Sequence, residues 1–80
     1  MMALATVLYF ASLRDAAGVA SESVDADGDL RMLYDSLRAR HGFVLPQERL
    51  RVAVDGEFAH WDQPVRAGSE IAFIPPVSGG

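Results

Sequence analysis

The sequence predicts an α+β domain in which a small sheet packs on one main helix. Residues 4–10 and 71–74 are apolar at nearly every position, which is typical of strands buried on both faces. Between them, residues 30–41 carry apolar side chains at the spacing of one helix face. Eighty residues with 50% hydrophobic and 22% charged side chains fit one globular domain.

The N-terminal third predicts two paired strands. Residues 4–10 form the first strand, and residues 11–18 are expected to form a loop that closes at Gly18. Residues 19–24 interleave polar and apolar side chains, as expected of a second strand that pairs back on the first.

The helix is predicted over residues 30–41. Asp29 stands immediately before the apolar pattern and is a good N-cap, and Gly42 is a natural C-terminal stop. Arg38, Arg40 and His41 lie near the end of the helix, where the macrodipole favours positive charge. The apolar face comprises Leu30, Leu33, Tyr34 and Leu37.

The second half predicts three short strands. Residues 43–50 form a loop, and Asp55-Gly56 is a hairpin signal between strands at 51–54 and 57–59. A longer connection leads to the last strand, residues 71–74, which ends at Pro75-Pro76 because proline has no N–H for the ladder.

One helix covers only one face of such a sheet. If Val7 and Tyr9 face the helix, Leu8 and Phe10 lie on the open face. An apolar patch there indicates either a partner surface or a surface that the chain's own loops cover.

Composition excludes several classes of function. The chain has no cysteine, which removes disulfides, thiolate metal sites and a catalytic thiol, and all seven of its basic residues are arginine. A net charge of −4 argues against nucleic acid or an anionic membrane as the main partner. Without a membrane-length apolar run or a basic leader, we expect a cytoplasmic protein.

No catalytic constellation is recognisable within the domain. His41 and His60 have no nucleophile or metal-ligand partner at suitable spacing, so we interpret both as surface or capping residues. The glycines punctuate turns and do not form a phosphate-binding loop.

The C-terminal residues carry the functional signal. Pro75-Pro76 favours an extended exit from the sheet, and Gly79-Gly80 can enter a channel too narrow for other residues. The Gly80 carboxylate is then the reactive group presented farthest from the folded body. The structural alternative is a frayed terminus.

Over essentially its whole length the chain resembles the small subunits of molybdopterin synthase, which are ubiquitin-like sulfur carriers of the β-grasp fold with a mixed sheet. The most specific segment is Gly-Ser-Glu-Ile-Ala-Phe-Ile-Pro-Pro-Val-Ser-Gly-Gly at 68–80, in which Ser69 replaces the family's usual aspartate. Phe-Ala-Ser-Leu-Arg at 10–14 and the helix residues 30–37 also match. The resemblance implies a β-grasp domain over residues 1–74 and a flexible tail over 75–80.

The resemblance implies a sulfur-transfer mechanism. An E1-like adenylyltransferase would use ATP to adenylate Gly80, and a sulfur donor would displace AMP to leave a thiocarboxylate. The tail, formed by Pro75, Pro76, Val77, Ser78 and Gly79 with Gly80, would insert into the large synthase subunit and deliver sulfur to a cyclic pterin precursor. This chain would be the sulfur-donating subunit of a heterotetrameric sulfurtransferase, with no stand-alone catalysis and no cofactor of its own.

The resemblance also suggests partner contacts. Phe10, Ile74 and Leu8 are candidate apolar contacts, and Arg14 is a candidate partner for a carboxylate. Core packing or a solvated charge is the alternative for these positions.

Three other functions remain open. The chain could carry sulfur for thiamine, tungsten-pterin or tRNA thiolation; it could be a modifier that joins Gly80 to target lysines; or it could be an interaction module with an inert tail. Only Pro-Pro-Val-Ser favours the synthase over the other sulfur carriers.

Overall fold

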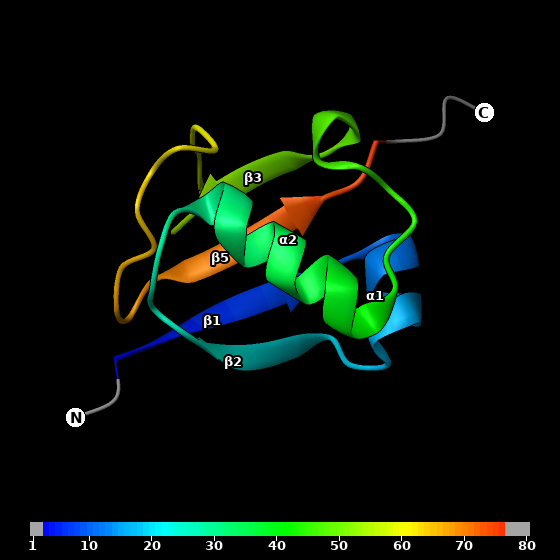
Figure 1. Ribbon diagram of the computed structural model, residues 1–80, viewed down its shortest axis with the longest axis horizontal. Coiled ribbons are helices and arrows are strands. Elements are labelled where there is room, and N and C mark those ends of the chain that lie inside the picture. The colour runs from blue at the N-terminus through cyan, green and yellow to red at the C-terminus, as the bar shows by residue number, and fades with distance from the viewer. Residues whose placement is uncertain (1–2, 77–80) are drawn as a thin grey trace.

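The computed structural model describes residues 3–76, which form one five-stranded sheet and two α-helices (Figure 1). The strands lie in the order β2-β1-β5-β3-β4. The elements are β1 (Leu4–Tyr9), α1 (Ala11–Ala17), β2 (Ser21–Asp25), α2 (Leu30–His41), a 3₁₀ turn (Gln47–Arg49), β3 (Arg51–Val54), β4 (Glu57–Phe58) and β5 (Glu70–Ile74).

The two strands with the most apolar sequences lie side by side near the centre of the sheet. β1 pairs with β5 in parallel, and each also pairs antiparallel with a further strand, β2 or β3. The sheet is therefore mixed, as the resemblance implied. The prediction that both strands are buried on both faces is wrong: alternate residues of each strand are buried, and Leu4 and Thr6 are exposed on the other face of β1.

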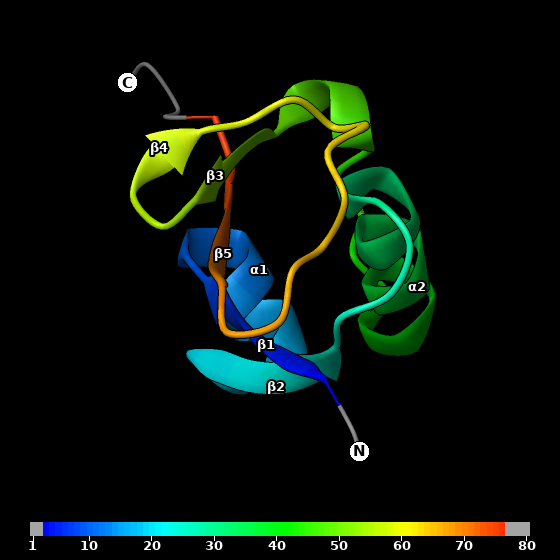
Figure 2. The same ribbon diagram turned by 90° about the vertical axis from the view of Figure 1, so that its left-hand side faces the viewer.

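Helix α2 covers one face of the sheet (Figure 2). Its predicted bounds are confirmed: the Asp29 carboxylate accepts a hydrogen bond from the Met32 backbone N–H at 2.8 Å, and Gly42 takes the left-handed conformation at φ 72°. The core lies between α2 and the sheet, where the centroids of the Tyr34 and Phe73 rings lie 5.2 Å apart.

The prediction of a loop over residues 11–18 is wrong, because residues 11–17 form helix α1. Seven residues with one buried side chain, Leu13, are too short for helical periodicity to be recognised. Gly18, which was interpreted as the end of a loop, is the C-cap of this helix at φ 77°.

Several predicted boundaries also shift. β1 ends at Tyr9, and Phe10 becomes the N-cap of α1 in extended conformation. β2 occupies residues 21–25, so Val19 lies before the strand and is exposed. The hairpin between β3 and β4 is confirmed, since Asp55 and Gly56 both have positive φ, as a type I′ turn requires.

The long connection before β5 is tied to the start of α2. The Leu30 N–H donates to the Gln63 carbonyl at 3.0 Å, and the Val65 N–H donates to the Gly28 carbonyl at 2.9 Å. Val65 is buried in the core, so this connection closes one end of the sheet–helix layer.

Within residues 3–76, neither helix has the length and apolar composition needed to cross a membrane.

Candidate functional site at the end of β5

The predicted tail begins where β5 leaves the middle of the sheet. β5 ends at Ile74; Pro75 is half-buried and Pro76 is exposed. Since neither proline has a backbone N–H, the ladder cannot continue through them. The other predicted tail residues, Val77, Ser78, Gly79 and Gly80, lie outside the described residues.

The open face of the sheet carries a row of small and apolar side chains. The strand register places Leu8 beside Ala72, Ala72 beside Ala53, and Ala53 beside Phe58. Val7 and Tyr9 are buried on the opposite face, as predicted, and Leu8 is half-buried. Helix α2 lies on the opposite face of the sheet from this row (Figure 2), and Leu8 and Ala72 in the row are half-buried.

The row ends in a hollow beside the tail exit. The Arg51 guanidinium carbon lies 5.2 Å from the centroid of the exposed Phe58 ring, and Arg51 pairs with Ile74 across the β3–β5 ladder. A hollow of about 410 Å³ lies here. Its lining consists of Glu48, Arg49, Leu50, Arg51, Phe58, Ile74, Pro75 and Pro76. We call this surface the tail-exit hollow.

The four predicted partner contacts differ in their position on the domain and in their burial. Leu8 and Ile74 are half-buried on the open face, whereas Phe10, 45% exposed, caps α1 beyond the end of β1. Arg14 is exposed on α1. Since Tyr9 pairs with Phe73, Phe10 lies at the same end of the sheet as Ile74.

The sequence reasoning missed Arg49, Arg51 and Phe58. Phe58 is 68% exposed. A two-residue strand has no measurable alternation, but the Asp55-Gly56 turn fixes its register and could have identified Phe58 as a side chain of the open face.

A separate polar cluster joins β1, β2 and α2 at Glu22. Its carboxylate accepts a hydrogen bond from the Tyr9 hydroxyl, and His41 Nε2 lies 2.7 Å from the same oxygen. Arg40 lies 3.6 Å from the other oxygen. The interpretation of His41 as a surface or capping residue is therefore wrong: its side chain is 14% exposed and packs beside the Tyr9 ring.

Burial, hydrogen bonds and nearby charges shift the pKa values of Glu22 and Tyr9 in this cluster. Burial by itself raises the pKa of the Glu22 carboxyl, but hydrogen bonds from Tyr9 and His41 together with the charge interactions with His41 and Arg40 outweigh burial and hold the pKa below its ordinary value. Burial, followed by the hydrogen bond to Glu22, raises the pKa of the Tyr9 hydroxyl. All of these partners lie within the domain, so we interpret the cluster as a structural link and not as a reaction centre.

Comparison with known proteins identifies the family. The model of the ThiS family matches residues 7–80, which covers both the folded domain and the tail. The chain belongs to the ThiS family.

Relatives of this ThiS-family chain are named either as sulfur carrier subunits or as a modifier protein. The molybdopterin synthase sulfur carrier subunit of Escherichia coli is 35% identical over 78 residues, covering 92% of this chain and 96% of the relative. The human protein of the same name is 32% identical, covering 92% and 91%. Small archaeal modifier protein 1 of Haloferax volcanii is 33% identical, covering 89% and 94%.

Solved structures confirm the ubiquitin-like β-grasp fold. The crystal structure of the Haloferax volcanii modifier SAMP1 has a TM-score of 0.77 at 30% identity, covering 96% of this chain and 99% of that chain. A chain from the complex of subunits 1 and 2 of the Helicobacter pylori molybdopterin-converting factor shares the fold, with a TM-score of 0.69 at 22% identity, covering 96% and 99%.

Proposed function

We propose that this ThiS-family chain is the sulfur-carrier subunit of a molybdopterin synthase and carries sulfur as a thiocarboxylate on Gly80. The observation that supports this most directly is the position of β5. A central strand, fixed by ladders on both sides, delivers Pro75-Pro76 to one end of the sheet beside a partly exposed apolar and cationic surface. Relatives named as sulfur carrier subunits match nearly the whole chain.

The proposed chemistry takes place on the main chain. The Gly80 carboxylate attacks the α-phosphorus of ATP in an E1-like adenylyltransferase, which releases pyrophosphate and forms an acyl adenylate. A sulfur nucleophile from a donor system then displaces AMP and leaves the thiocarboxylate. Activation is required because a carboxylate is a poor electrophile, and this chain's own residues supply no thiol or lysine amine for the reaction.

The rest of the domain positions the tail. Docking of the open face on the large subunit would bury Leu8, Ile74 and the exposed Phe10 ring, while Arg14 would pair with a carboxylate of the partner. The tail would then reach the pterin precursor inside the partner, and glycine at positions 79 and 80 would pass a narrow channel. After transfer the carrier would leave with an ordinary carboxylate.

The decisive experiment measures the intact mass of the chain after incubation with its activating partner, MgATP and a sulfur donor. We expect a mass gain equal to replacement of one oxygen by sulfur, located in the peptide that contains Gly80. Conversion of the pterin precursor on addition of the large subunit then identifies the pathway. An unchanged mass, in a mixture that thiolates a control carrier, would overturn the proposal.

A second candidate is a protein modifier, because small archaeal modifier protein 1 is also similar over nearly the whole chain. This function uses the same activated Gly80 but transfers it to a lysine amine of a target. Lysine-linked adducts that form in cells and disappear when Gly80 is deleted would favour it over the synthase.

A further inference from the structure

β2 is the longer of the two edge strands of the sheet. It pairs with β1 on one side only, whereas the opposite edge, β4, is just two residues long. β2 has five residues and no proline, which would block strand pairing; its charged side chains are Glu22 and Asp25.

The hydrogen-bond register shows which backbone groups of β2 face outward. The Tyr9 N–H donates to the Ala20 carbonyl at 2.9 Å, and the Ala26 N–H donates to the Ala3 carbonyl at 2.8 Å. Because antiparallel pairs alternate, residues 20, 22, 24 and 26 direct their backbone groups toward β1. Ser21, Ser23 and Asp25 therefore direct theirs toward the free edge, and within residues 3–76 no hydrogen bond occupies them.

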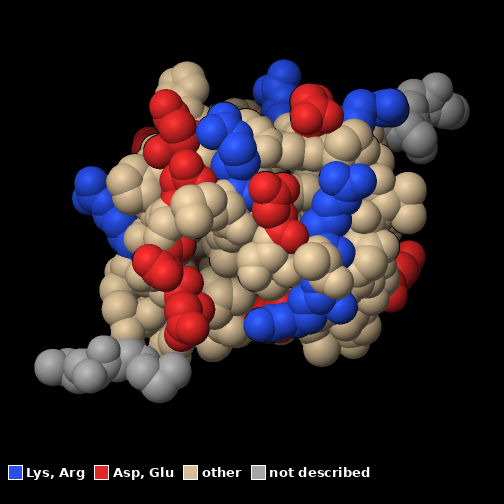
Figure 3. Space-filling model, viewed as in Figure 1, with Lys and Arg blue, Asp and Glu red and all other residues tan. Residues whose placement is uncertain are grey.

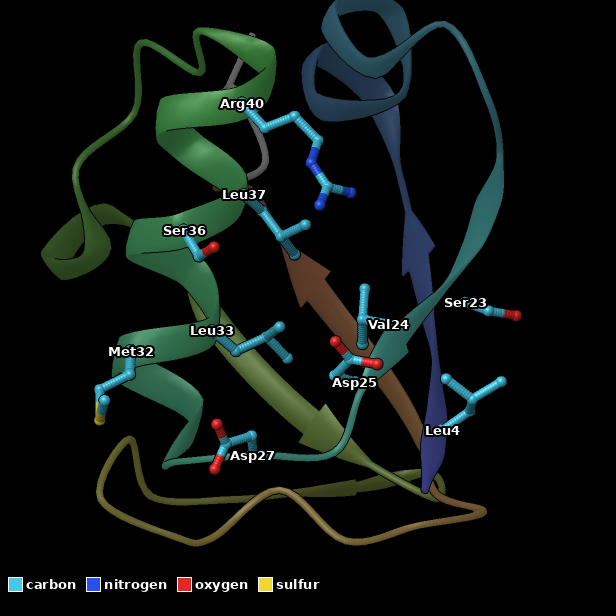
Figure 4. Close-up of a pocket in the computed structure, with 10 residues that line it drawn as sticks. All are labelled: Leu4, Ser23, Val24, Asp25, Asp27, Met32, Leu33, Ser36, Leu37 and Arg40. Carbon is cyan, nitrogen blue, oxygen red and sulfur yellow. The ribbon is translucent and has the colours of Figure 1, made fainter. Parts of the chain in front are cut away.

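A groove of about 450 Å³ runs between this edge and α2. Figure 4 shows Val24 of β2 and Leu33 and Leu37 of α2 directed toward the space between the two elements. Val24, Leu33 and Leu37 are buried in the core, whereas Leu4 and Met32, which also line the groove, are 44% and 61% exposed. Exposed apolar side chains next to unpaired backbone groups are the combination that binds an extended peptide by strand addition.

The two ends of the groove carry opposite charge. Arg40 lies at one end; its side chain is 61% exposed, and its 3.6 Å contact with Glu22 leaves other guanidinium donors free for a ligand. Asp25 and Asp27 lie at the other end. Figure 3 shows the same separation on this face, with acidic side chains gathered on the left of the view and arginines near the end of α2.

We propose that β2 and its groove bind an extended segment of a partner protein, which joins the sheet as a sixth strand. The segment has apolar side chains at alternating positions, an acidic residue at the Arg40 end and a basic residue at the end marked by Asp25 and Asp27. Two copies of this chain are disfavoured as partners by their net charge of −4 each. The site lies at the edge of the sheet opposite β4, so it is distinct from the tail-exit hollow.

The test titrates the full-length ¹⁵N-labelled chain with the heptapeptide Asp-Thr-Val-Thr-Ile-Thr-Arg and with its reversed sequence, since parallel and antiparallel pairing require opposite orders. In both, the charged and apolar residues share one face of an extended strand. We expect saturable amide shifts for one order, confined to residues 21–27 and the groove side of α2. No binding by either order, or shifts confined to the tail-exit hollow, would overturn the proposal.

Two substitutions and one matched control locate the contact. Ser23→Pro removes an outward N–H, and Arg40→Gln removes the positive charge; each should weaken binding about tenfold or more. Arg66→Gln removes an exposed arginine outside the groove and should change affinity less than twofold. Equal effects of Arg40→Gln and Arg66→Gln would mean that the peptide senses only net charge, which overturns the proposal.

A modified peptide keeps the test valid if Ser23→Pro fails to fold. N-methylation of the Val and Ile amides blocks one edge of the peptide strand, and N-methylation of the Thr amides blocks the other. Strand addition predicts that only one set abolishes binding, because only one edge faces β2. Equal loss with both sets contradicts the proposal, as do amide shifts in β2 that depend on protein concentration without peptide, which would identify a second copy as the occupant.

Discussion

Glu22 shows how one side chain can link three elements. It lies on β2, yet its carboxylate accepts hydrogen bonds from Tyr9 of β1 and from His41 at the end of α2. A bond to a charged group typically contributes about 1.5–3 kcal/mol, more than a neutral bond. The cluster therefore fixes the C-terminal end of α2 against the edge strand.

The lowered pKa of Glu22 makes its contribution depend on pH. A carboxyl whose pKa is lower in the folded state than its ordinary value of 4.5 stabilises the fold above that value, and the stabilisation is lost as the pH falls through the folded-state pKa. We expect Glu22→Gln to lower the free energy of unfolding by about 1–2 kcal/mol at neutral pH, and the loss to shrink as the pH falls through the lowered pKa of Glu22.

Urea denaturation of both proteins across this pH range measures the effect. Glu57→Gln is the matched control, since Glu57 is exposed on β4 and should give the wild-type stability at each pH. A Glu22→Gln deficit that stays constant down to acid pH would show that the carboxylate charge is not the cause.

Phe10 permits a test of a predicted partner contact that separates binding from folding. Its position as the extended N-cap of α1 suits aspartate, so Phe10→Asp should keep the stability of the domain. Binding to the large synthase subunit should weaken at least about tenfold, because an exposed aromatic ring is lost and a charge is introduced.

Isothermal calorimetry measures that affinity, and Val44→Asp provides the control. Val44 is 87% exposed beside the C-terminal end of α2, so the same charge introduced there should leave binding unchanged. If both variants weaken binding equally, Phe10 is not a contact and the effect is one of net charge.

Among the elements, α2 depends on its caps. Asp29→Ala removes the carboxylate that accepts from the Met32 N–H, and we expect it to cost about 1 kcal/mol, or roughly 4–8 °C in Tm. Asp29→Asn retains an acceptor and should restore most of the stability. Thermal unfolding followed by circular dichroism distinguishes the two; equal losses would show that charge, not the cap, is responsible.

At the scale of the whole molecule, we expect the residues that stabilise the fold to differ from those that carry the proposed chemistry. The core described by the structure is formed by residues between Ala5 and Phe73, and a glycine has no side chain to add to a core. We expect Gly79→Val to leave Tm nearly unchanged and to abolish sulfur transfer from an already thiolated chain. Gly79→Ala, the smallest step from glycine, should retain part of the activity.

Calorimetry and single-turnover conversion of the pterin precursor measure the two effects of Gly79→Val separately. Full activity of Gly79→Val would contradict the narrow-channel mechanism, whereas a large loss of Tm would show that the tail has a structural role.

Local features of the chain could be predicted from the sequence because short-range chemistry determines them. The periodicity and caps of residues 30–41, the Asp55-Gly56 turn and the apolar strands around Val7 and Ile71 each depend on neighbours a few residues away. The Pro-Pro-Val-Ser-Gly-Gly motif likewise predicts the candidate site from the sequence alone.

Only the tertiary structure showed what lies together across long sequence separations. Helix α1 is too short to be recognised by periodicity. Its one buried residue, Leu13, packs in the core of the domain, and this tertiary contact is absent from the local sequence pattern. Phe58 joins Ile74 at the tail-exit hollow because β3 lies between β4 and β5, and His41 meets Glu22 because the C-terminal end of α2 lies beside β2. Such contacts depend on strand order and packing, which no local pattern in the sequence contains.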